Sequence, residues 1–269
     1  MNTPSIDRYR RVRVLRQVVL RVMLMGSVGT SGCATRHAVE RPAADLVVHT
    51  FNRDYTNAHL VARGDEYFLV DAGLERNGPR LASDLRDAGF DPARLRAIIV
   101  THGHADHAGG AGYFQRTWGT PIVVGEGDTG LLSQGHNDAL CPTSKMATRR
   151  LQSAQAETFQ TFAPNVTITQ ATDLRPLTGI PGRVVPIPGH TEGSIAVIVD
   201  GAALVGDLLR GSVVGSAAKI GFYMCDVPDN RRDIATLVDE LAPTANTFFV
   251  GHFGPVDRGS VAALARPTR

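Results

Sequence analysis

Three histidines and one aspartate lie within six residues, in the run His102-Gly103-His104-Ala105-Asp106-His107, directly after the apolar residues 97–100. Residues two apart on an extended chain point the same way, so His102 and His104 can bind one ion together. Asp106 and His107 follow the bend and can face a second ion. Imidazole and carboxylate together suit zinc and, less often, iron or manganese. The run therefore predicts a metal centre with two ions, rather than histidines that only begin a helix.

Three more ligand candidates follow at wide spacing. His190, Asp207 and His252 each come just after an apolar, strand-like run and next to a glycine. Open α/β sheets place their ligand sites beyond the carboxyl ends of strands. A neighbouring glycine lets the backbone turn sharply and approach an ion. Any one of these pairs alone is a weak signal, but their order along the chain supports a single site.

This order of motifs resembles the metallo-β-lactamase superfamily, from about Asp45 to the C-terminus. The resemblance implies one ion held by His102, His104 and His190, a second held by Asp106, His107 and His252, and Asp207 as the bridge between them. Asp71, within 69–73, matches the family's first motif. Its implied role is to orient a ligand or loop by hydrogen bonding.

Two strand-rich halves, each with ligands, predict an α/β fold in which two sheets pack face to face with helices outside. This is the four-layer αββα sandwich that the resemblance implies. The strands are expected at 46–51, 58–62, 67–70, 97–100, 121–124, 183–187, 194–199, 202–205 and 247–250, and the helices at 80–88, 107–118, 145–162 and 230–241. The polar stretch 125–164 is expected to cover the substrate, and its His136 either enters the pocket or lies in a solvated loop.

The resemblance implies an enzyme, a zinc-dependent hydrolase with two Zn²⁺ ions, although iron or manganese also suits the ligands. Two such ions share a water and lower its pKa from about 15.7 toward neutrality, and the resulting hydroxide attacks an ester, thioester, lactone or amide. Asp106 is also a candidate proton shuttle to the leaving group. The charge of the ions predicts a small anionic substrate. Arg210, three residues after Asp207, either binds its carboxylate or is a surface arginine.

Several residues narrow the choice within the superfamily. True metallo-β-lactamases carry Cys or Ser in place of Asp207, which argues against a β-lactamase without excluding one. Glyoxalase II enzymes resemble the chain at all seven ligands but add a C-terminal extension that binds glutathione, and only about 17 residues follow His252. Lactonases carry a tyrosine where this chain has Arg210. A mononuclear iron persulfide dioxygenase, which shares the equivalents of His102, His190 and Asp207, and a non-catalytic binding protein remain alternatives.

The first 32 residues differ from the rest, because they carry six arginines and one aspartate while the remainder has a net charge of −3. An apolar stretch at 22–29, too short to span a bilayer, precedes Ser31-Gly32-Cys33. We expect a lipoprotein signal peptide at 1–32, lipidation of Cys33, a tether at 33–44 and the hydrolase domain at 45–269. The mature protein would then face the bacterial periplasm on a membrane. A cytosolic leader is the alternative.

The remaining composition gives two further expectations. The body has no basic stripe with interleaved aromatic residues, which argues against nucleic-acid binding. Cys141 and Cys225 lie outside the ligand motifs and either pair in an oxidising compartment or stay as buried thiols. His59, inside an apolar strand, is expected to be a core residue with its polar atoms satisfied.

Overall fold

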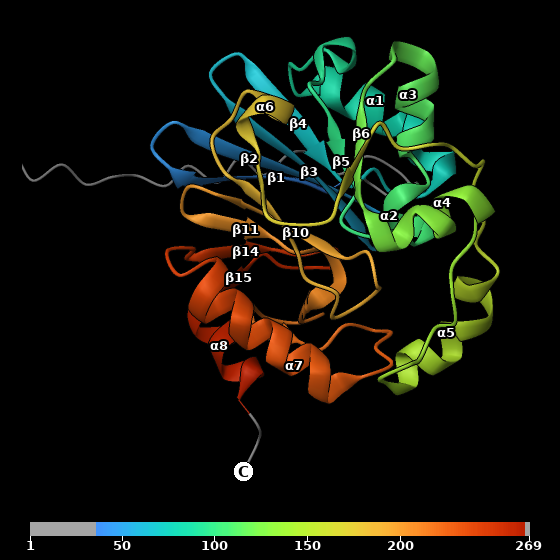
Figure 1. Ribbon diagram of the computed structural model, residues 1–269, viewed down its shortest axis with the longest axis vertical. Coiled ribbons are helices and arrows are strands. Elements are labelled where there is room, and N and C mark those ends of the chain that lie inside the picture. Colours follow the sequence, from blue (N-terminus) through green and yellow to red (C-terminus); the bar gives the residue numbers. More distant parts are fainter. Residues whose placement is uncertain (1–35, 267–269) are drawn as a thin grey trace, which may run out of the picture. The chain divides into compact units, whose positions relative to one another are not determined.

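The computed structural model describes residues 36–266, which contain two large β-sheets and the helices that cover them (Figure 1). The first sheet has seven strands in sequence order, namely β1 (Arg36–Ala43), β2 (Leu46–Arg53), β3 (Thr56–Arg63), β4 (Glu66–Val70), β5 (Ile98–Ile99), β6 (Ile122–Gly125) and β7 (Val166–Ile168). Strands β1 to β4 form an antiparallel meander, whereas β4 to β7 run parallel. The carboxyl ends of β4, β5 and β6 therefore meet at one edge.

The second sheet has six strands in the order β15-β14-β11-β10-β9-β8. They are β8 (Thr172–Asp173), β9 (Arg183–Pro186), β10 (Ile195–Val199), β11 (Ala202–Leu204), β14 (Thr247–Phe249) and β15 (Val256–Asp257), and a separate ribbon joins β12 (Arg210–Gly211) to β13 (Ala218–Lys219). The helices are α1 (Gly78–Asp87), α2 (Ala105–Ala108), α3 (Ala111–Trp118), α4 (Thr129–Gln134), α5 (Lys145–Gln155), α6 (Arg175–Thr178), α7 (Val227–Thr236) and α8 (Arg258–Ala265). Strands β11 and β14 run parallel, so the segments that follow them leave from the same edge.

Three apolar clusters separate the layers. The cluster between the sheets includes Val48, Val61, Phe68 and Ile99 from the first sheet and Val184, Val197, Leu204 and Phe249 from the second. The outer face of the first sheet buries Leu81 and Phe114 of α1 and α3, and the outer face of the second buries Ile234 and Val261 of α7 and α8. Figure 1 shows these helix pairs on opposite sides of the two sheets. The predicted αββα sandwich is confirmed.

The structure corrects some of the expected boundaries. The predicted tether at 33–44 contains strand β1, which pairs antiparallel with β2. Charged residues and Pro42 made this segment resemble a linker, but they are also typical of an edge strand. The helix expected at 107–118 is divided into α2 and α3 at Gly110, where a Cβ would lie 2.2 Å from the carbonyl oxygen of Ala72. The helix expected at 145–162 ends at Gln155.

The expected signal peptide at 1–32 and the lipidation site Cys33 lie outside the described residues. Within residues 36–266, no helix is long and apolar enough to cross a membrane.

Cys141 and Cys225 form a disulfide, with 4.9 Å between their Cα atoms. Of the two alternatives for these cysteines, the structure therefore has the pair. Cys141 lies between α4 and α5, and Cys225 lies in the loop that leads to α7. The backbone N–H of Met224 also donates to the carbonyl of Cys141 at 2.8 Å. The bond therefore joins the segment that carries α5 to a loop of the second half of the domain.

Candidate metal centre

The segments that follow four strands bring all seven expected ligands together. His102 and His104 follow β5, Asp106 and His107 lie on α2, and His190, Asp207 and His252 follow β9, β11 and β14. Three groups have ligand atoms within 4.8 Å of one another: His102 with His104 and His190, His102 with His107 and Asp207, and Asp106 with His107 and His252. The groups share His102 and His107, so they form one continuous cluster.

Four polar atoms in this cluster are buried and have no hydrogen-bond partner in the described part of the chain. They are Nε2 of His102, Nε2 of His107, Nδ1 of His190 and Oδ1 of Asp207. Buried polar atoms normally have partners, so a group of orphaned ones requires an explanation. Imidazole nitrogens and carboxylate oxygens are ligands of divalent metals such as zinc. The donor set and its unpaired atoms therefore fit a metal centre.

Asp207 lies between the two histidines of the second half of the cluster. Its Oδ2 is 3.0 Å from Nε2 of His252, and its Oδ1 is 3.4 Å from Nε2 of His107. The Oδ2 of Asp106 is 3.5 Å from His252 and 3.7 Å from His107, and it accepts a hydrogen bond from Thr56 at 3.1 Å. Asp207 also has a ligand atom within 4.8 Å of ligand atoms of His102 and His107, so it lies between the two expected ligand sets, where the bridging residue was expected.

Asp71 orients the first motif through buried hydrogen bonds. Its Oδ2 accepts from Nδ1 of His107 at 2.8 Å and from the hydroxyl of Thr101 at 2.8 Å, while its Oδ1 accepts from the Thr101 N–H at 2.7 Å. With Nδ1 of His107 occupied in this way, its Nε2 is directed at the cluster. This contact is of the kind that the resemblance implied, a hydrogen bond that fixes a ligand ring.

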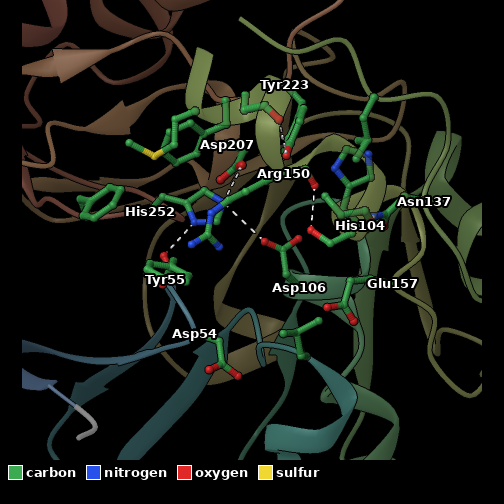
Figure 2. Close-up of a pocket in the computed structure, with 18 of the residues that line it drawn as sticks. Asp54, Tyr55, His104, Asp106, Asn137, Arg150, Glu157, Asp207, Tyr223 and His252 are labelled. Atoms are coloured by element: carbon green, nitrogen blue, oxygen red, sulfur yellow. Dashed lines mark hydrogen bonds and ion pairs between the residues drawn. The ribbon is translucent and has the colours of Figure 1, made fainter. Parts of the chain in front are cut away.

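Other ligands are oriented by groups that the sequence analysis missed. Nε2 of His104 lies 2.8 Å from Oδ1 of Asp138, so the Nδ1 of His104 faces Nε2 of His190 at 3.1 Å. Nδ1 of His252 lies 2.8 Å from the carbonyl of Tyr55 in the β2–β3 turn, which leaves its Nε2 for the cluster. Figure 2 shows His252 between Tyr55 on one side and Asp207 and Asp106 on the other.

Asp128, also missed, joins two ligand-bearing loops. Its carboxylate is buried and accepts from the N–H of Gly103 at 2.6 Å, the hydroxyl of Thr191 at 2.7 Å and the N–H of Gly193 at 2.9 Å. The first donor lies between His102 and His104, and the others follow His190. A signal for it existed, because Asp128 closely follows the strand β6 as the ligands follow theirs.

Burial and neighbouring charges divide the histidines into two kinds. Burial lowers the pKa of His102 well below its usual value and lowers that of His190 to about 3. Burial would also lower the pKa of His107, but the carboxylates of Asp106, Asp207 and Asp71 raise it to about 10. The same effect of Asp207 and Asp106 raises the pKa of His252. Nearby histidines lower the pKa of Asp207 despite its burial.

Zinc binding at pH 7 is expected to release about one proton or more per chain, because His107 must lose its proton to become a ligand. Zinc affinity should accordingly rise with pH until the pKa of about 10 of His107 is passed. Titration calorimetry of zinc into metal-free protein, in two buffers with different ionisation enthalpies, measures the released protons. Equal heats in both buffers would contradict the protonated state of His107.

Gly251 allows the cluster to close, since a Cβ there would lie 2.2 Å from Oδ1 of Asp207 and 2.4 Å from Cε1 of His107. We expect Gly251→Ala to weaken zinc binding by about tenfold or more, as loss of a ligand's support typically does. Equilibrium dialysis against a zinc chelator measures this change. Gly130→Ala is the matched control, because a Cβ there meets nothing closer than 3.7 Å. Normal zinc affinity in Gly251→Ala would show that the cluster tolerates the methyl group.

A pocket of about 390 Å³ opens onto the cluster. Its lining includes His104, Asp106, Asp207 and His252 from the cluster and the charged residues Asp54, Arg150 and Glu157 (Figure 2). The lining also includes Arg76 and an apolar wall of Leu74, Leu140, Met146, Ala147, Phe222 and Phe253. The cluster is therefore reachable by a small molecule.

Other residues singled out in the sequence lie elsewhere. Arg210 is not among the residues that line the pocket; its guanidinium stacks on the ring of Phe222 at 4.2 Å and donates to the carbonyl of Gly211. Its proposed carboxylate-binding role stays a prediction. His136 is an exposed loop residue outside the lining. His59 is buried, with Nδ1 2.9 Å from the Thr50 hydroxyl and Nε2 3.1 Å from the Val250 carbonyl, as expected for a satisfied core residue.

Two curated relatives indicate the kind of protein that the chain resembles. The probable metallo-hydrolase YybB of Bacillus subtilis is 26% identical over 187 residues, covering 69% of this chain and 76% of that protein. A hydroxyacylglutathione hydrolase of Anaeromyxobacter dehalogenans is 30% identical over 151 residues, or 56% of this chain. The chain spans 45% of the length of this second relative.

Solved structures and a family model give the broader relationship. The subclass B3 metallo-beta-lactamase BJP-1 of Bradyrhizobium japonicum matches with a TM-score of 0.60 at 16% identity, covering 81% of this chain and 86% of that one. A metallo-beta-lactamase of Cronobacter sakazakii matches with a TM-score of 0.60 at 19% identity, with the same coverage. Such identities show a shared fold. The model of the metallo-beta-lactamase superfamily matches residues 51–252, so the chain belongs to this superfamily.

Proposed function

We propose that this protein is a dinuclear zinc-dependent hydrolase of small ester, thioester, lactone or amide substrates. The observation that carries the proposal is the convergence of seven metal-type side chains, with unpaired buried atoms, at the end of an accessible pocket. Relatives described as a metallo-hydrolase and as hydroxyacylglutathione hydrolases support hydrolysis as the reaction class. Zinc is favoured among divalent metals by the mix of imidazole and carboxylate.

When bound, the metals would supply a water of lowered pKa and polarise the substrate carbonyl. The chain's own residues would orient the proton-transferring carboxylate and exclude water from the pocket. The hydroxyl of Thr56 donates to Asp106 and fixes its carboxylate where it lines the pocket, a suitable position for passing a proton to the leaving group. The apolar wall beside it excludes water from the reacting carbonyl and strengthens electrostatic interactions there.

Metal analysis and a substrate screen test the proposal together. Purified protein should hold about two zinc ions per chain after dialysis and hydrolyse at least one activated thioester, lactone or ester, with activity lost on chelation and restored by zinc. A single iron per chain, with oxygen uptake in the presence of glutathione persulfide, would instead identify a dioxygenase. Full occupancy of the metal sites with no turnover of any substrate class would favour a binding protein.

β-Lactams are expected to be poor substrates, because true metallo-β-lactamases typically carry Cys or Ser at the position of Asp207. Nitrocefin hydrolysis by the zinc-loaded protein should have a kcat/KM below about 10⁴ M⁻¹s⁻¹, the lower end of the ordinary enzyme range. The rate for the best thioester or lactone of the screen is the reference. A higher value for nitrocefin would return β-lactams to the list of candidate substrates.

We also propose that the protein is exported and anchored to a bacterial membrane by lipid on Cys33. The basic and apolar leader and the Ser31-Gly32-Cys33 motif support this, and the Cys141–Cys225 disulfide suits an oxidising compartment. Cys33→Ser should move the protein from the membrane fraction to the soluble periplasmic fraction. Wild-type protein found in the cytosol with residues 1–32 intact would contradict export.

A further inference from the structure

Two arginines line the pocket, and their surroundings differ. The guanidinium of Arg76 is 3.5 Å from the carboxylate of Asp54 and 3.2 Å from that of Glu157, so it forms ion pairs with both acidic residues of the pocket wall. Arg150 of α5 forms no ion pair with any carboxylate among residues 36–266. The remaining acidic groups of the lining, Asp106 and Asp207, belong to the metal cluster. Arg150 is therefore the cation of the pocket that has no acidic partner in the described chain.

Arg150 is exposed, and one contact orients its guanidinium. Its guanidinium carbon lies 4.4 Å from the centre of the Tyr55 ring, which is within the range of a cation–π interaction. The backbone of Tyr55 also accepts the hydrogen bond from His252. A single turn residue thus places both a cluster histidine and the guanidinium. Stacking occupies the face of the guanidinium and leaves its N–H edge available for a planar acceptor.

The neighbours of Arg150 have the chemistry of a site for an acid with an apolar portion. Met146 and Ala147 precede it on the same helix, and Phe222 and Tyr223, from the loop that the disulfide joins to the segment before α5, line the same pocket. The hydroxyl of Tyr223 donates to the carbonyl of Ala147 at 3.3 Å, so the two sides of this wall are in contact. Burial and the charge of Asp106 raise the pKa of Tyr223.

We propose that Arg150 binds a carboxylate of the substrate and makes the enzyme selective for acyl compounds that combine an apolar group with a free carboxylate. This inference rests on the proposed hydrolase function and names its substrate class. Guanidinium–carboxylate pairs form two parallel hydrogen bonds, which gives both affinity and orientation. Arg150, which lines the pocket, is a specificity-determining residue.

Binding of an unreactive analogue tests Arg150 independently of turnover. Phenacylthioacetate, a ketone that cannot be hydrolysed, and its carboxamide differ only in the charged group. Calorimetry with zinc-loaded wild-type protein should show the carboxylate binding about tenfold or more tighter than the carboxamide, the difference expected of one charge-assisted pair. In Arg150→Met this preference should fall by about tenfold, and Arg150→Lys, which keeps the charge but not the fork, should be intermediate.

Arg149→Met is the matched control, because Arg149 is the preceding residue of the same exposed helix and does not line the pocket. It should keep the wild-type preference. An Arg150→Met protein that discriminates as well as Arg149→Met, or a wild-type protein that binds the two analogues equally or binds neither, overturns the inference.

A parallel assay separates this inference from the proposed function. S-Benzoyl thioglycolate and its carboxamide are hydrolysed at the acyl carbon–sulfur bond, with water supplying one oxygen of benzoate, one proton to the released thiol and a second proton to solvent. Hydrolysis of both thioesters with equal kcat/KM supports the hydrolase and refutes the role of Arg150. Turnover of neither, together with Arg150-dependent binding of the analogue, refutes this thioester as a substrate and keeps the carboxylate site.

Discussion

Asp207→Ala is expected to lower the zinc content from about two ions per chain toward one while the fold persists. Asp207 lies 3.0 Å from His252 and 3.4 Å from His107 of the second ligand set, and it also groups with His102 of the first set, so its removal affects both halves of the cluster. His102, His104 and His190 would still offer three ligands, enough for one zinc with an open fourth position. Hydrolysis should fall by more than the 10- to 100-fold that is typical of losing a residue behind a ligand.

Elemental analysis after dialysis, circular dichroism and turnover of one confirmed substrate measure the three parts of this prediction. Asp200→Ala is the control, because Asp200 is an exposed acidic residue whose contact is a surface ion pair with Arg63. Two ions retained with near-normal turnover would mean that Asp207 is only a turn residue, and the two-metal proposal would have to be abandoned.

Asp128→Asn is expected to weaken zinc binding by about 10- to 100-fold, although Asp128 is not among the residues of the cluster. The carboxylate accepts from three donors, at Gly103, Thr191 and Gly193. An amide of the same shape has one acceptor oxygen and two N–H groups, so at least one buried backbone donor faces another donor. Leaving a buried donor unsatisfied costs about 1–3 kcal/mol, so thermal unfolding should occur at lower temperature.

Zinc affinity by competition with a chelator and thermal unfolding of the zinc-free protein measure these effects separately. Glu126→Gln makes the same chemical change two residues earlier, at an exposed position, and should leave both values unchanged. An Asp128→Asn protein with reduced stability but normal zinc affinity would show that Asp128 holds the loops together without positioning His102, His104 or His190.

The ligands could be recognised in the sequence because each carries its own local signal. An apolar run, a glycine and a metal-type side chain stand side by side at His190, Asp207 and His252, and the order of the strands requires their ends to meet. The layered fold followed from the same runs. The division between α2 and α3 was not predicted, because it depends on the close approach of the Ala72 backbone to Gly110.

The groups that orient the ligands could not be recognised in this way. Asp138 reaches His104 from a segment 34 residues later, and the Tyr55 carbonyl reaches His252 across 197 residues. Their residue types are ordinary for turns and loops, and a backbone carbonyl leaves no trace in the sequence. The same holds for Arg150, since its significance depends on which arginine of the pocket has already been neutralised. The sequence pointed to Arg210 for carboxylate binding because it lies three residues after Asp207.

The Cys141–Cys225 bond complicates the usual interpretation of thiol inhibition. Asp138 precedes Cys141 by three residues and holds His104, while Tyr223 and Phe222 precede Cys225 and line the pocket. Dithiothreitol would therefore act twice, as a chelator of zinc and as a reductant of the bond that anchors this wall. A phosphine reductant cleaves disulfides without the paired thiols of dithiothreitol, and a carboxylate chelator removes zinc without reduction. Loss of activity with the phosphine alone would show that the disulfide is needed, and loss with the chelator alone would show that zinc is needed. Protein produced in a reducing cytosol would lack the disulfide from the start.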